Sequence, residues 1–178
     1  MKPPILPAES LRRVMRLARF DGLSVLIVAG GFALLSAASR DVSGAAIGLL
    51  IAGAGAIELH GVGLLRAGQE GMKWLISSQL FLMGTILVYA GFRILRPDVA
   101  WMLPYVTGEA AEPILQAAQQ QGLTVEQLLV GAMSMFYVLV AIITLLYQGG
   151  MTIYYLRRRK AVELALKEED PQQGQTGV

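Results

Sequence analysis

The segment from Gly44 to Arg66 constrains the fold of this chain most strongly. Its sequence, GAAIGLLIAGAGAIELHGVGLLR, is apolar and long enough to cross a bilayer, which takes about 20 helical residues. Similar apolar stretches occur at about 20–38, 74–92 and 126–156, and the most apolar part of this segment is 44–65. Charged residues make up 16% of the chain, whereas soluble domains contain about a quarter. The sequence therefore predicts an all-α integral membrane protein with four transmembrane helices in a bundle.

The apolar stretches divide the chain into three parts. Residues 1–19 form a basic amphipathic arm, residues 20–156 the four-helix transmembrane domain, and residues 157–178 a tail that is basic and then disordered. The first stretch is short for a span, and a signal peptide cleaved after Ala38 is the alternative interpretation. A second apolar stretch follows almost directly, which favours an uncleaved span.

The links between the stretches predict how neighbouring helices are connected. The polar link 66–73 is so short that the spans 44–65 and 74–92 must form an antiparallel hairpin. The longer region 93–127 contains prolines, and Pro113 can begin a short amphipathic or interfacial helix that ends near Gly122. Thr124 and Gln127 have the spacing of a capping box at the start of the last helix.

The basic residues predict the orientation. Twelve of the fifteen lie in the two ends of the chain or in the 66–73 link. By the positive-inside rule, both termini and this link face the cytoplasm, and the 93–127 loop is external. We therefore expect a multi-pass protein of a bacterial-type inner (plasma) membrane.

A stripe of small residues follows the second span at intervals of four. Residues at this spacing share one face of a helix, and small side chains let a neighbouring backbone approach closely in lipid. The stripe predicts tight packing, either within the bundle or against another protomer or subunit. It consists of Gly44, Gly48, Ala52 and Ala56.

Polar residues inside the hairpin form the second candidate site. Glu58 lies within the apolar segment, where an unpaired carboxylate is costly. The hairpin register brings it level with Ser78 and Gln79, so we predict an intramembrane polar network of Glu58, His60, Ser78 and Gln79, with Arg66 reaching back toward Glu58. This network either fixes the hairpin register or relays protons, or else its residues simply reach the lipid headgroups.

Several kinds of chemistry find no support in the residues. The chain has one histidine and no cysteine, which argues against a multi-histidine metal centre and excludes thiolate chemistry. It contains no Walker loop, nucleophile elbow or HExxH motif. A net charge of +2 does not indicate a nucleic-acid partner. We expect no catalytic residue, no cofactor and no metal.

Three functions remain open, and all are tied to a lipid bilayer. The leading hypothesis is a non-enzymatic protein acting through helix packing, as a homo-oligomer or as an accessory subunit of a larger membrane complex. The alternative is a small proton-sensitive transporter or channel that uses Glu58 and His60. A third possibility is a pore-forming or envelope-stress protein whose basic ends meet anionic lipid.

Overall fold

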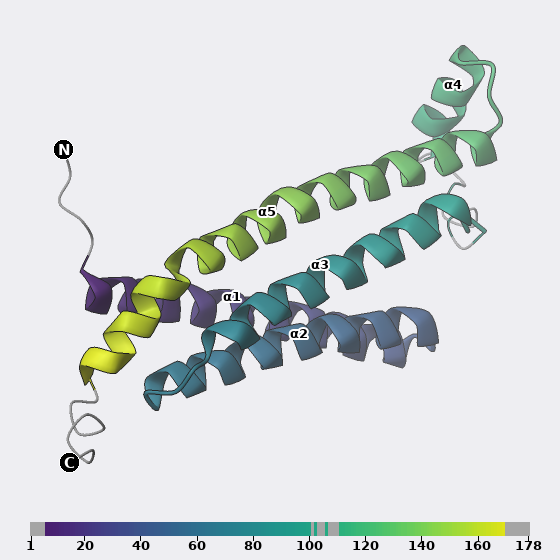
Figure 1. Ribbon diagram of the computed structural model, residues 1–178. Coiled ribbons are helices and arrows are strands. Elements are labelled where there is room, and N and C mark those ends of the chain that lie inside the picture. The colour runs from purple at the N-terminus through teal and green to yellow at the C-terminus, as the bar shows by residue number, and fades with distance from the viewer. Residues whose placement is uncertain (1–5, 101, 103–105, 107–110, 170–178) are drawn as a thin grey trace, which may run out of the picture. The chain divides into compact units, whose positions relative to one another are not determined.

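All regular secondary structure in the described part of the chain is helical. The computed structural model describes residues 6–100, 102, 106 and 111–169. Four of its helices are long and apolar enough to cross a membrane, as the sequence predicts, and α4 is the short helix expected in the 93–127 loop. The five helices in Figure 1 are α1 (Pro7–Ala38), α2 (Val42–Arg66), α3 (Met72–Leu95), α4 (Glu112–Gln120) and α5 (Val125–Glu169).

Two of the helices extend well beyond the predicted spans. Helix α1 begins at Pro7, so the basic arm from residue 7 onward and the first apolar stretch form one continuous helix. Proline suits the first turn because its missing N–H would be unpaired there anyway. Helix α5 has 45 residues, or about 68 Å at 1.5 Å per residue, which exceeds the bilayer core. It includes the basic residues 157–160, and residues 170–178 of the predicted tail lie outside the described part.

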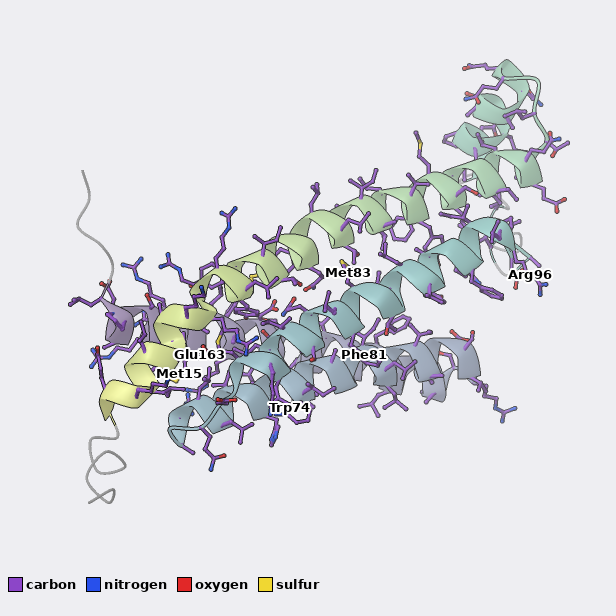
Figure 2. The ribbon with its side chains drawn as sticks, viewed as in Figure 1. Met15, Trp74, Phe81, Met83, Arg96 and Glu163 are labelled. Atoms are coloured by element: carbon purple, nitrogen blue, oxygen red, sulfur yellow. The ribbon has the colours of Figure 1, made fainter. Side chains whose placement is uncertain are left out.

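The chain divides into two compact units. The first unit comprises Met1–Thr85 and Leu145–Val178, and the second comprises Ile86–Thr144. In the first unit, α1, α2, the start of α3 and the end of α5 share one apolar core. Figure 2 shows Met15, which packs on this core, and Glu163 in the same region of the unit. The buried core residues are Leu11, Val14, Ala18, Val62, Leu65, Met72, Leu75, Met151, Tyr155, Val162, Ala165 and Leu166.

Small residues hold α1 and α2 together as an antiparallel hairpin (Figure 1). A Cβ atom added to Gly48 would lie 2.8 Å from the Cβ of Ala33, and one added to Gly55 would lie 2.7 Å from the carbonyl oxygen of Gly22. Neither site has room for a side chain, so the backbones of α1 and α2 are in close contact at both positions. Asp41 starts α2 by accepting a hydrogen bond from the Gly44 N–H at 3.0 Å.

The second unit contains the predicted capping box. The Thr124 N–H donates to Gln127 Oε1 at 2.9 Å, and the Gln127 N–H donates to Thr124 Oγ1 at 3.2 Å. These reciprocal bonds satisfy two backbone donors at the start of α5 and confirm the expected cap. Gly122, with φ +63°, takes the left-handed conformation after α4 that glycine adopts most easily. Within this unit, Val99 packs against Leu129 and Met133.

Candidate functional site

The close contact of α1 and α2 places two acidic side chains side by side. Asp21 and Gly22 lie in α1, opposite Gly55 and Glu58 in α2, and a Cβ added to Gly22 would lie 3.3 Å from the Cβ of Glu58. Glu58 is completely buried, and Asp21 is 4% exposed. We call Asp21 and Glu58 the acid pair. A larger residue at either glycine would separate the helices and open the pair.

Gln79 of α3 connects the two carboxylates. Its Nε2 donates to Asp21 Oδ2 at 2.8 Å and to Glu58 Oε2 at 3.0 Å. The neighbouring Ser78 donates from Oγ to the carbonyl oxygen of Ala54 at 2.7 Å, which holds α3 on α2. Ser78 and Gln79 are both completely buried. The start of α3 therefore supplies both a tether and a shared donor for the acid pair.

Two tyrosines of α5 complete the hydrogen bonding of the pair. The hydroxyl of Tyr155 donates to Glu58 Oε1 at 2.7 Å, and that of Tyr147 donates to Asp21 Oδ1 at 2.9 Å. Each of the four carboxylate oxygens thus accepts one hydrogen bond. Tyr155 is completely buried, whereas Tyr147 is 50% exposed and connects the pair to the surface of the first unit. The carboxylate network comprises Asp21, Glu58, Gln79, Tyr147 and Tyr155.

The donors in this network carry no positive charge. Within the described part of the chain, no lysine, arginine or histidine forms an ion pair with Asp21 or Glu58. Two buried carboxylates side by side repel each other strongly, and neutral hydrogen bonds offset this repulsion in part. A bound proton relieves the repulsion directly. The arrangement is therefore suited to taking up and releasing a proton.

The side-chain amide of Gln79 also places an acceptor oxygen, Oε1, at this site. Its Oε1 is buried and has no hydrogen-bond partner in the described part of the chain. The same residues contain no group of three or more histidine, aspartate or glutamate side chains placed to hold a metal ion. The site therefore combines four carboxylate oxygens with one unpartnered amide oxygen.

Three of the five residues predicted for the polar network lie together, and two lie elsewhere. Glu58, Ser78 and Gln79 meet where α2 packs on α3. His60 is exposed, with its ring edge-on to Trp74 at a centroid distance of 5.3 Å (Trp74 is labelled in Figure 2). Residues two apart point about 200° away from each other on a helix, so His60 cannot share the face of Glu58. Arg66 is exposed at the end of α2.

Most residues of the predicted small-residue stripe are buried within the chain itself. Gly44, Gly48 and Ala52 are buried, but Ala56 is exposed. A four-residue step overshoots the helical turn of 3.6 residues, so such a stripe drifts around the helix. Gly55, three residues after Ala52, is the buried residue that continues the contact with α1.

Asp21, Tyr147 and Tyr155 were not among the predicted site residues. Asp21 carried a signal, because it is the one acidic residue in the apolar stretch of α1. Nothing in the sequence pairs it with Glu58, since the register of α1 on α2 depends on which small residues meet. Tyr147 and Tyr155 lie near the end of the apolar stretch of α5, where interfacial anchors are also common.

The tyrosine hydroxyl that contacts Glu58 should contribute measurably to stability. We expect Tyr155→Phe to lower the free energy of unfolding by about 1–2 kcal/mol, because a buried carboxylate oxygen loses its donor. Tyr154→Phe is the matched control, since the Tyr154 ring is half-buried and packs against Arg158. Unfolding in mixed micelles measures both values. Equal stability of the two variants would contradict the Tyr155–Glu58 hydrogen bond.

No protein-family model, curated protein or solved structure matches this chain.

Proposed function

We propose that this chain is a small, non-enzymatic, multi-pass membrane protein that uses the acid pair as a proton-binding site, as a transporter or channel would. One observation carries this proposal: two buried carboxylates share the Gln79 amide and have no cationic partner among the described residues. Acidic side chains inside membrane helices face the protein interior and are typical of proton and ion pathways.

The depth of the acid pair supports this function. Glu58 precedes Leu65 by seven residues, which corresponds to about 10 Å along α2. With the orientation that the basic residues favour, the pair lies a short distance inside the cytoplasmic face of a bacterial-type inner membrane. Tyr147, which is half-exposed and bonded to Asp21, extends the carboxylate network toward the surface of the first unit. The acid pair is therefore about two helical turns from the cytoplasmic end of α2.

The experiment is a proton-flux measurement on the purified full-length protein in liposomes. A pH-sensitive dye is enclosed, and a pH gradient is imposed with the membrane potential clamped. We expect proton entry above that of protein-free liposomes, and we expect Glu58→Gln and Asp21→Asn each to remove the excess. Both substitutions keep the side-chain size but remove the ionisable group.

His60→Gln serves as the control, because His60 lies on the exposed face of α2, away from the acid pair. It should leave the flux unchanged. The proposal is wrong if the wild-type protein is as proton-tight as empty liposomes under gradients in both directions, or if both acid-pair variants retain the flux.

A second candidate function is that of a packing subunit, either in a homo-oligomer or in a larger membrane complex. Helix α5 favours it, because 11% of its most apolar 18-residue stretch is buried. The exposed apolar side chains there suit lipid or another membrane helix equally well, and they include Met135, Phe136, Leu139, Ile142, Ile143 and Leu146. Proton-tight liposomes, together with co-purification of stoichiometric membrane subunits, would favour this function over the first.

A further inference from the structure

A groove lined in part by arginines lies on the first unit, and neither residue of the acid pair lines it. Its volume is about 530 Å³, and both α1 and the end of α2 contribute to it. The groove is open at the protein surface, and its lining combines guanidinium groups with apolar side chains. The lining residues are Arg12, Met15, Arg16, Arg19, Phe20, Leu23 and Arg66.

The arginines of this groove have no anionic partner in the described part of the chain. Arg12, Arg16 and Arg19 are spaced by four and three residues, so they share one face of α1, and Arg66 joins them from α2. By contrast, Arg13, one residue from this face, forms an ion pair with Glu9. Four like charges around one groove repel each other, so the groove is suited to an anion that neutralises them together.

The apolar lining indicates what kind of anion fits. Phe20 is 73% exposed and Leu23 is 37% exposed, and both lie where the basic part of α1 gives way to its apolar stretch. A small inorganic anion would use the arginines and leave these side chains without a partner. A lipid uses both, because its phosphate lies at the interface and its acyl chains run into the apolar layer.

We propose that this groove binds the headgroup of an anionic phospholipid. The guanidinium groups of Arg12, Arg16, Arg19 and Arg66 hold the phosphate, for which arginine offers planar paired donors. An acyl chain then lies against Phe20 and Leu23. Basic pockets between membrane helices at the cytoplasmic face are suited to such lipids, whereas scattered basic residues attract the membrane surface without binding one molecule.

Native mass spectrometry of the full-length protein tests this site directly. The protein is released from nanodiscs of phosphatidylcholine that contain a fraction of phosphatidylglycerol, and the lipids that remain bound are counted. We expect one phosphatidylglycerol to be retained by the wild-type protein. The double variant Arg16→Gln/Arg66→Gln should bind this lipid about 25-fold more weakly, since each arginine near an anionic surface contributes about fivefold.

Arg157→Gln/Lys160→Gln is the matched control, because it removes two exposed positive charges from α5 outside the groove. It should retain the lipid. Equal loss in both double variants would show general attraction to the surface and overturn the proposal. Displacement of the lipid by inorganic phosphate at similar concentration would also overturn it, since the acyl chain would then contribute nothing. All four substituted residues are exposed, so we expect both double variants to fold like the wild-type protein. Thermal melting of each variant checks this.

Discussion

Gly48→Leu is expected to prevent normal folding of the helical hairpin. A Cβ atom at this position would lie 2.8 Å from the Cβ of Ala33 and 2.9 Å from its Cα and backbone nitrogen. Backbone atoms cannot move aside as a flexible side chain can, so α1 and α2 must separate along their contact. Overpacking of this kind costs at least about 3 kcal/mol for so large a side chain. Unfolding in mixed micelles and the yield of folded protein measure the effect.

Gly53→Leu is the matched control for this substitution. Gly53 lies in the same helix, and a Cβ added there has no other atom within 4 Å. The same glycine-to-leucine change should therefore leave stability close to the wild-type value. If Gly48→Leu were as stable as Gly53→Leu, the small residues would not form the contact between α1 and α2, and the acid pair would lose its structural basis.

Gln79→Leu is expected to cause the second large loss of stability. The side chains are similar in size, but leucine lacks the amide NH2 group whose nitrogen donates to both carboxylates, so two buried carboxylate oxygens lose their donor. Each such acceptor costs about 1–3 kcal/mol, and more when it is charged, so we expect a loss of about 3 kcal/mol. Unfolding titrations of the purified variant in mixed micelles provide the value.

Ser77→Leu is the control on the same helix, because Ser77 is exposed and faces away from the acid pair. Its stability should equal or exceed that of the wild-type protein, since leucine suits an apolar surface. A Gln79→Leu protein that unfolds like Ser77→Leu would show that the amide is not the shared donor of the acid pair.

The helices could be predicted well from the sequence, but their ends could not. Apolar runs of span length in a chain poor in charge leave little choice but membrane-length helices. Residue 20 was expected to separate an arm from a span because charge gives way to apolar residues there. The backbone continues because Leu11, Val14 and Ala18 form a face that packs into the core of the first unit. A change from charged to apolar residues marks where a helix enters apolar surroundings. It does not mark where the helix begins.

The candidate site could be predicted only where chain connectivity determined the neighbours. The short link 66–73 restricts the register of α2 on α3, so Glu58 was expected level with Gln79, and the two side chains are hydrogen-bonded. The register of α1 on α2 depends on side-chain packing, which no spacing rule specifies, so Asp21 was missed. His60 was included in the predicted network because the hairpin register brings it level with the polar residues of α3, but it lies on the exposed face of α2, where its ring contacts Trp74.

Infrared difference spectroscopy tests most directly whether the acid pair binds a proton. Spectra of the full-length protein in lipid are compared between high and low pH, and the carbonyl stretch of a protonated carboxylic acid is followed. We predict a component from a buried carboxylic acid that both Asp21→Asn and Glu58→Gln alter, because the two groups share one environment. Glu70→Gln, which changes an exposed carboxylate, should leave this component in place. A spectrum that neither acid-pair variant alters would contradict proton binding at this site.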